Sequence, residues 1–331
     1  MAFRRQAMVG ALFALIATAA LAQWGTMYDS GQLQASFKTY SPNLRGMWTE
    51  DMRARLGPED RQVLAGVQLL SPLIGTHGHP LDYYADVAAR RIYIPILSVR
   101  FLDDLAITQS WMSYRVCTQP ALIDYVAMLR YRNPAEFPEG RYPTPREALR
   151  VPDDVLKIGY VDDLSGKILK STIFFLIAHE AAHIRFGHLT YGEITPGKAQ
   201  AQEMQADNFA LDVMQLVGVP PNGLALFFTA AHAFEPAPSD FASPAAYEAH
   251  RRSVTHPVTA ARLLALADRM RSQAARFAHA EPDPAKVTKL VVDGGAQIAL
   301  LAGNLQDVKL KEFQKLRGRS VDLPTLRFAC P

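Results

Sequence analysis

The sequence contains very little cysteine. Only Cys117 and Cys330 occur among its 331 residues. At most one intramolecular disulfide can therefore form, and it would join the extreme C-terminus to the N-terminal half of the chain. The sequence leaves open whether the two pair, because a disulfide requires a short Cα separation. The G-x-S-x-G motif is also absent, so neither a serine nucleophile of that type nor a cysteine nucleophile is indicated.

The chain also lacks a strong excess of one charge. It has 35 Lys and Arg against 32 Asp and Glu, a formal net charge of +3, and no long run of one sign. Nucleic-acid binding usually requires a basic patch or stripe, so no nucleic-acid partner is expected. The 49% hydrophobic and 20% charged content is typical of a globular protein. The length suggests one large domain or two modest ones.

Long apolar runs are absent except at the N-terminus. Arg4 and Arg5 precede the uncharged apolar residues 7–22, which end in a small-x-small site at Ala22. This pattern predicts a signal peptide over 1–22, cleavage after Ala22 and a periplasmic or secreted protein. Because 1–22 contain two Arg and no acid, cleavage lowers the formal charge from +3 to +1. The alternative is an uncleaved anchor, which would be the only membrane contact, since no other stretch reaches about 18 uncharged apolar residues.

Helical patterns dominate the remainder of the chain, which predicts a mainly α protein with a small β element. A β-branched and aromatic stretch at 90–102 is the best strand, limited by Pro95 to an edge or a broken strand. Residues 23–60 are expected to be loosely structured, and 133–152 to form a proline-rich loop. The expected helices cover 60–75, 103–131, 162–187, 199–217, 222–233 and 245–278.

The stretch "FFLIAHEAAHIRFGH" at 174–188 combines an apolar segment with ionisable side chains. Buried ionisable groups are costly unless something compensates for them. His179 and His183 are four residues apart on a predicted helix, so they share a face and can bind one zinc ion. Glu180 is then placed to take a proton from zinc-bound water. His179-Glu180-x-x-His183 therefore predicts a catalytic zinc site in which Glu180 is the base.

A catalytic zinc ion needs a third protein ligand and an open position. Nineteen residues separate His183 from Glu203, which the next predicted helix presents together with Asp207, four residues further on. We assign Glu203 as the third zinc ligand. Asp207 is the expected partner of a ligand imidazole, because metal-bound histidines usually donate their other N–H to a carboxylate. The core around this site is expected to span 151–280.

Three motifs in this order resemble the zinc endopeptidases of the heat-shock and CAAX-prenyl-protease kind, which are gluzincins. They are "HEAAH", Glu203-x-x-Ala206-Asp207 and "THPVTAARL" at 255–263. The resemblance covers about residues 160–270 and implies a zincin-like fold. It also implies that His256 lies near the zinc and stabilises the oxyanion, or else is a structural residue at a helix start. Arg262, six residues after His256, would belong to the same motif or form an ion pair.

The three motifs divide the chain into expected regions. Residues 23–150 would pack on the metallopeptidase core at 151–280, and 281–331 would form a helical extension. The predicted function is an exported zinc metalloendopeptidase that acts on peptide or protein substrates. One alternative is a non-catalytic, zinc-stabilised binding or chaperone-like protein, although such a protein would not need Glu180. Another is a membrane-tethered assembly factor, if 7–22 stay attached.

The other histidines are weaker candidates for metal ligands. His188 follows His183 by five residues, which rotates it about 140° from the ligand face at about 100° per residue. It is therefore expected to have a structural or surface role. His77 and His79 form an H-x-H pair without a nearby carboxylate or cysteine pattern, which favours a loop over a metal site.

Overall fold

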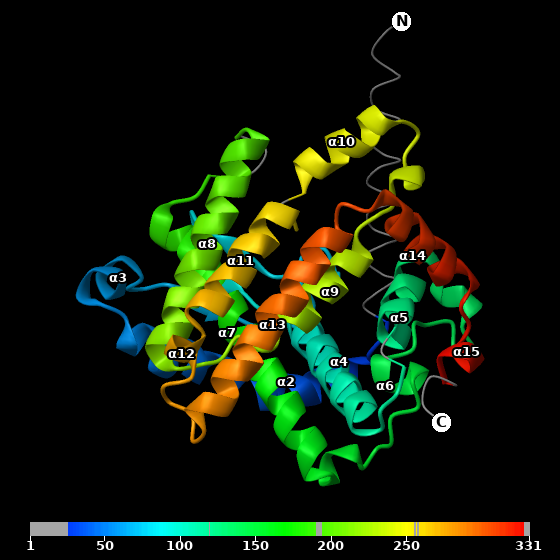
Figure 1. Ribbon diagram of the computed structural model, residues 1–331, viewed down its shortest axis with the longest axis horizontal. Helices are drawn as coiled ribbons and strands as arrows, with labels where there is room; N and C mark the ends of the chain where they lie inside the picture. The colour runs from blue at the N-terminus through cyan, green and yellow to red at the C-terminus, as the bar shows by residue number, and fades with distance from the viewer. Residues whose placement is uncertain (1–25, 119, 190–193, 255, 257, 328–331) are drawn as a thin grey trace, which may run out of the picture.

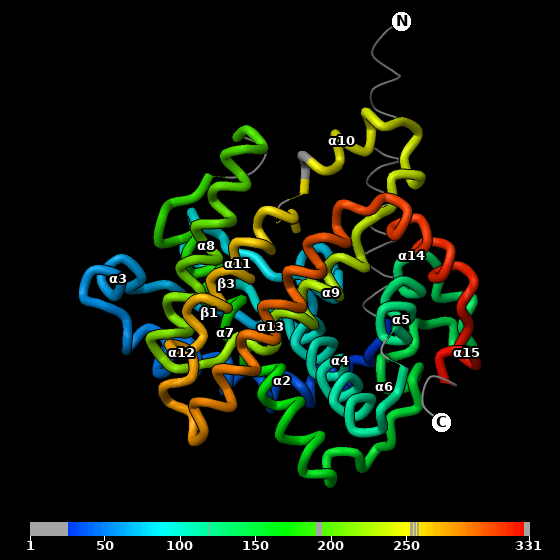
Figure 2. Tube along the Cα trace, in the orientation of Figure 1, coloured from blue at the N-terminus to red at the C-terminus, as the bar shows by residue number. Residues whose placement is uncertain are grey.

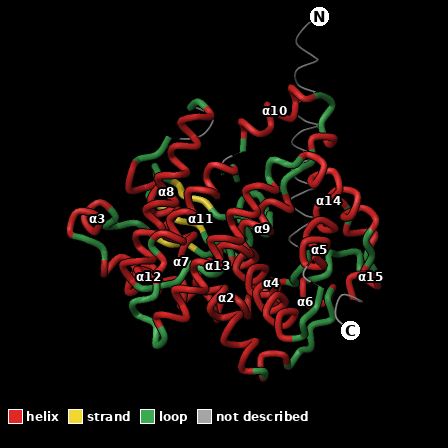
Figure 3. Tube along the Cα trace, in the orientation of Figure 1, coloured by secondary structure: helices red, strands yellow, loops and turns green. Residues whose placement is uncertain are grey.

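The computed structural model describes residues 26–118, 120–189, 194–254, 256 and 258–327. Helices make up 69% of these described residues, and the only sheet in these ranges has three short strands. The predicted mainly α class with a small β element is confirmed (Figures 1 and 3). None of the described helices is long and apolar enough to cross a membrane.

Residues 26–63 are helical rather than loosely structured, which corrects the expectation for 23–60. Asp29 and Gln32 form a capping box that starts the first described helix, and Leu33 and Leu44 bury one face of it. Trp48 and Met52 continue this buried face. The polar composition concealed the helices because only one face is apolar. The elements are α2 (Ser30–Gly46), η1 (Met47–Met52), η2 (Arg53–Arg55) and α3 (Pro58–Val63).

The sheet is small and mixed. It consists of β1 (Gln68–Leu70), β2 (Tyr84–Asp86) and β3 (Arg91–Tyr93) in the order β1-β3-β2. Leu69 pairs with Ile92 in the parallel ladder, and Ala85 pairs with Ile92 in the antiparallel one. Both β2 and β3 contact α7, and Figure 2 shows β3 beside that helix.

Two predicted elements around the sheet are wrong in part. The helix expected over 60–75 ends at Val63, and β1 follows. The strand expected over 90–102 ends at Tyr93, and Pro95 becomes the N-cap of α4 (Ile96–Tyr114). The first turns of α4 are buried on nearly all sides, so their β-branched and aromatic residues reflect burial in the core and not strand pairing.

Four further helices form the centre of the molecule: α5 (Pro120–Tyr131), α7 (Gly159–Phe186), α8 (Pro196–Val217) and α9 (Leu224–Phe234). α7 packs against α4, α8 and α9, and its long apolar stretch is buried. The helices predicted at 162–187, 199–217 and 222–233 are confirmed. The proline-rich segment between α5 and α7 contains η3 (Pro134–Glu136), α6 (Pro145–Ala148) and η4 (Val155–Lys157).

The C-terminal helices pack back onto the centre. α13 runs along α11, and α14 lies on α5 (Figure 1). The helix expected over 245–278 is broken into three, because the chain leaves α10 at Val254 in an extended conformation and turns again at Gln273. The elements are η6 (Pro238–Asp240), α10 (Pro244–Ser253), α11 (Ala260–Ser272), α12 (Ala274–Phe277), α13 (Pro284–Asn304), α14 (Val308–Ser320) and α15 (Leu323–Arg327).

Some predictions concern residues outside the described ranges, and the predicted domain boundaries are not tested by the structure. The signal peptide at 1–22 and Cys330 lie outside the described residues. Cys117 is buried and is not a free thiol. One continuous apolar cluster includes side chains from all three regions expected after the signal peptide. The boundaries at 150 and 280 stay predictions.

Candidate metal centre

The buried half of α7 carries the histidine pair. His179 and His183 lie one turn apart, 2% and 5% exposed, among apolar neighbours that pack on α4 and α8. Their Nε2 atoms are 3.1 Å apart, so both rings turn toward one point. The helix ends immediately afterwards at Gly187, whose φ of 60° is the left-handed conformation that favours glycine at a helix C-terminus.

α8 returns beside α7 and brings Glu203 to the same point. Glu203 is fully buried, and its Oε2 and Oε1 lie 3.4 Å from the Nε2 atoms of His179 and His183, respectively. Thr195 caps the N-terminus of α8 and Gly218 ends it, so two full turns precede Glu203 and fix its position. The structure therefore brings together the three residues that the sequence assigned as metal ligands.

His256 enters the cluster from the segment between α10 and α11. Its Nδ1 lies 3.2 Å from Glu203 Oε1, and its Nε2 lies 3.8 Å from Glu180 Oε1. One ligand atom each from His179, His183, Glu203 and His256 lies within 4.8 Å of the others. This His/Glu cluster is the only group of this kind among the described residues, and it could hold a metal ion. His256 thus lies beside both Glu203 and Glu180.

Asp207 and Arg262 surround the cluster with hydrogen bonds. His179 Nδ1 lies 2.9 Å from Asp207 Oδ1, as expected for a carboxylate that orients a metal-binding imidazole. Arg262, 4% exposed on α11, donates through Nε and Nη2 to Asp207 and pairs through Nη1 with Glu203 Oε2 at 2.7 Å. One guanidinium therefore holds both carboxylates, which lie one turn apart on α8.

His188 lies outside the cluster but touches it. Its Nδ1 is 2.8 Å from His183 Nδ1, and its Nε2 is 3.1 Å from Gln205 Oε1. A rotation of about 100° per residue does not apply to His188, because the chain leaves the helix at Gly187. The glycine one residue before His188 is the signal that could have revealed it.

Electrostatic interactions favour the ionised forms of the carboxylates. Burial alone would raise the pKa of Glu203, but His256, Arg262 and His179 outweigh it and lower that pKa well below its ordinary value. Burial opposes a charge on His179, yet Glu203 and Asp207 raise its pKa to about 10. A negatively charged Glu203 facing two imidazoles is a donor set that suits a divalent cation.

Glu180 lies beside the cluster in a different setting. It is 2% exposed, and its Oε2 is buried without a hydrogen-bond partner among the described residues. A buried carboxylate oxygen without a partner is costly, so such an atom in a native site calls for a bound water, ion or substrate. The position of this oxygen next to the ligand atoms fits a metal-dependent site.

A pocket of about 120 Å³ opens next to Glu180. His179, Glu180, His256 and Arg262 form its polar side, while α7, α9, the segment before β2 and the segment before α11 supply an apolar wall. The wall consists of Leu81, Tyr83, Phe175, Leu176, Phe227, Phe228, Ala231 and Val258. The site can therefore accept an apolar group beside the buried carboxylate.

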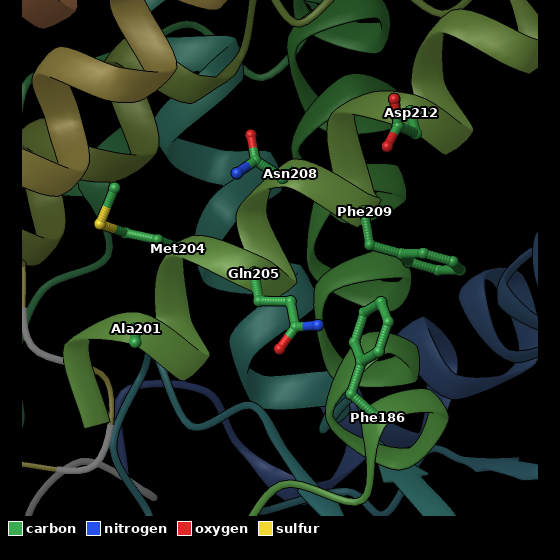
Figure 4. A pocket seen from close by; sticks show the side chains of 7 residues that line it. All are labelled: Phe186, Ala201, Met204, Gln205, Asn208, Phe209 and Asp212. Carbon is green, nitrogen blue, oxygen red and sulfur yellow. The ribbon is translucent and has the colours of Figure 1, made fainter. Parts of the chain in front are cut away.

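A wider hollow of about 510 Å³ lies on the other side of α8 (Figure 4). Phe186 and Phe209 meet edge to face there, with ring centroids 5.8 Å apart. None of the cluster residues lines it. The other histidine pair also carries no metal cluster: His77 Nδ1 contacts Asp82, and His79 Nδ1 accepts from the Leu81 backbone.

The comparisons with known proteins agree with a hydrolytic site. Neither the curated proteins nor the solved structures compared with the chain include a match. A family model described as peptidase U49 matches residues 115–280, half of the chain. The matched range contains the whole His/Glu cluster, together with Glu180, Asp207 and Arg262. The chain belongs to the peptidase U49 family.

Proposed function

We propose that the protein is an exported zinc metalloendopeptidase of the gluzincin type, with a zincin-like fold. The observation that carries the proposal is the convergence of His179, His183 and Glu203 beside the buried Glu180. Two imidazoles and one carboxylate are a common ligand set for catalytic zinc. When bound, zinc would lower the pKa of a water molecule and polarise the scissile carbonyl.

The residues of the chain would divide the remaining work. Glu180 accepts a proton from the attacking water, whose oxygen bonds to the carbonyl carbon. As the C–N bond breaks, Glu180 passes this proton to the leaving nitrogen. His256, partly exposed and close to Glu180, would donate a hydrogen bond to the oxyanion that develops. Asp207 and Arg262 hold His179 and Glu203 in place.

The apolar pocket beside Glu180 supports a substrate class. A volume of about 120 Å³ with a mainly apolar wall suits an aliphatic side chain of a peptide or protein next to the cleaved bond. Burial of such a side chain would contribute about 1.5–3 kcal/mol to binding. Substrates with Leu, Ile, Val or Met at that position are therefore expected to be cleaved faster than those with Asp or Glu.

The test of the mechanism is Glu180→Gln, which keeps the size of the side chain but removes the base. Metal content by elemental analysis should stay near that of the parent protein, while cleavage of a fluorogenic peptide library falls about 10²- to 10⁴-fold. Glu248→Gln, at a half-exposed site on α10, is the matched control and should retain activity. Full activity of Glu180→Gln would disprove the assignment of the base.

The test of the metal site is Glu203→Ala. It should lower zinc occupancy and leave two buried imidazoles with fewer partners. Unchanged metal content in this variant would remove Glu203 from the ligand set.

Export is proposed from the N-terminal sequence alone. N-terminal sequencing of protein recovered from the periplasm or the medium should yield Gln23 as the first residue. A chain that keeps residues 7–22 would instead support the membrane-tethered alternative.

A further inference from the structure

A second cavity lies apart from the His/Glu cluster. It is a groove of about 380 Å³ between α4, α5, α7, α9 and α13. Its volume is within the range typical of small-molecule sites and about three times that of the pocket beside Glu180. Leu105, Leu122, Val126 and Ile168 form much of its apolar surface, and none of the cluster residues lines it.

The polar groups of the groove are all neutral. Gln109, Ser113, Asn222, Thr229 and Gln297 line it, with no Asp, Glu, Lys, Arg or His. A charged ligand would leave its solvation shell here without gaining a counter-charge, which is strongly unfavourable. The chemistry of the walls therefore selects a neutral ligand.

Asn222, one of the residues that line the groove, carries a polar atom without a partner among the described residues. The Oδ1 of Asn222 is buried and accepts no hydrogen bond within the described part of the chain. A buried acceptor left in this state costs about 1–3 kcal/mol. A ligand N–H or O–H that reached this oxygen would recover that energy.

We propose that this groove binds a neutral, mainly apolar small molecule that carries a hydrogen-bond donor for Asn222. The site is independent of the peptidase chemistry, since it shares no residue with the cluster. It nevertheless touches the same helix. α9 presents Ala225, Leu226 and Thr229 to the groove, and Phe227 and Phe228 to the pocket beside Glu180.

The experiment uses two matched probes on the full protein. N-Phenyl-1-naphthylamine is neutral, apolar and has one N–H, whereas 8-anilinonaphthalene-1-sulfonate has the same ring system with a negative charge. The neutral probe should bind saturably at one site per chain, with enhanced fluorescence. The sulfonate should bind at least tenfold more weakly, because the groove offers no cation.

Two variants localise the binding. Thr229→Phe fills the groove and should weaken binding of the neutral probe at least tenfold, whereas Thr39→Phe, at an exposed position of α2, should not. Asn222→Leu keeps the approximate size of the side chain but removes its hydrogen-bond acceptor, and should weaken binding of the neutral probe several-fold. Thermal unfolding and metal content establish that each variant is folded.

Three results would overturn the proposal. One is non-saturable fluorescence of the neutral probe. The second is equal binding by the Thr229→Phe and Thr39→Phe variants. The third is sulfonate binding that matches the neutral probe and depends on Thr229. None of these binding measurements depends on peptidase activity. Failure of the proposed peptidase function would therefore leave the test of the groove intact, and the two failures can be told apart.

Discussion

Arg262 explains how two acids can be buried side by side at the His/Glu cluster. Glu203 and Asp207 are 0% and 3% exposed, and the guanidinium contacts both. Breaking a buried ion pair leaves an uncompensated charge, which typically costs about 3–5 kcal/mol. The motif resemblance left open whether Arg262 belongs to the site or forms an ion pair, and the geometry shows that it does form one.

Asp207→Asn tests the orientation of His179. The amide keeps the shape but removes the charge that His179 Nδ1 and Arg262 share. Metal affinity, measured by competition with a chromophoric chelator, should fall about 10- to 100-fold. Asp212→Asn, at an exposed position of the same helix, is the control and should leave affinity unchanged. Equal affinity of the Asp207→Asn variant and the parent would show that the contact does not tune the metal.

Most of the site could be predicted because its geometry is local. His179, Glu180 and His183 are fixed by helical spacing, and Glu203 with Asp207 by the same spacing on the next helix. The meeting of His256 with Glu203 is different: 53 residues separate them, and no local rule predicts such a contact. Only the resemblance of the three motifs to the zinc endopeptidases predicted that His256 lies near Glu203.

At the scale of elements, α9 depends on one close approach. The backbone N–H of Gly223, just before the helix, donates to Ser171 Oγ on α7 at 2.7 Å. A Cβ at Gly223 would lie 2.3 Å from the carbonyl oxygen of Ile168 and from Thr172 Oγ1. Only glycine therefore fits at this contact between α7 and α9.

Gly223→Ala should accordingly destabilise the protein. The methyl group forces α9 away from α7, and overpacking of this kind costs about 1–3 kcal/mol. Urea unfolding followed by circular dichroism measures the change. Gly303→Ala provides the contrast, because its Cβ would meet nothing within 4 Å on α13. It should raise stability by about 0.5–1 kcal/mol. The prediction fails if both substitutions shift the midpoint in the same direction.

The elements that were predicted wrongly share a physical cause. The first turns of α4 are buried on nearly all sides, so their sequence is an apolar run without clear periodicity. Such a run fits a buried strand as well as a buried helix, and a strand was predicted there. The opposite occurred in α2, where a narrow buried face in a polar sequence concealed a helix. Long helices with clear stop signals, such as α7 before Gly187, were predicted well.

At the scale of the whole molecule, acid sensitivity should arise at the junction of α9 and α14. His232 is buried, and Lys311 donates to its backbone carbonyl. Burial, helped by Lys311, lowers the pKa of His232 to about 3. A depressed pKa means that the folded state resists protonation while the unfolded chain binds a proton below its ordinary value of about 6.5.

The contribution of neutral His232 to the free energy of unfolding is therefore fully present above pH 6.5, and it is lost as pH falls toward 3. The slope is at most about 1.4 kcal/mol per pH unit. In urea unfolding between pH 7 and 4, His232→Gln should lose less stability on acidification than the parent. His279→Gln, at an exposed position, should not change the slope. Equal slopes in all three proteins would contradict the assignment.

The arrangement of the C-terminal helices could not be predicted from the sequence. Arg317 on α14 pairs with Asp124 on α5, although 193 residues separate them. Amphipathic patterns indicate which face of a helix is buried but not which helix covers it. The long-range packing that encloses the site is therefore the part that only the structure provides.

None of the eleven positions of α9 is fully exposed: each is buried or partly buried. One side walls the pocket beside Glu180 and the other walls the neutral groove. A substitution that improves one surface thus alters the backbone on which the other depends. In a saturation mutagenesis experiment we expect α9 to tolerate fewer amino acids than α10, although α9 supplies no residue to the His/Glu cluster.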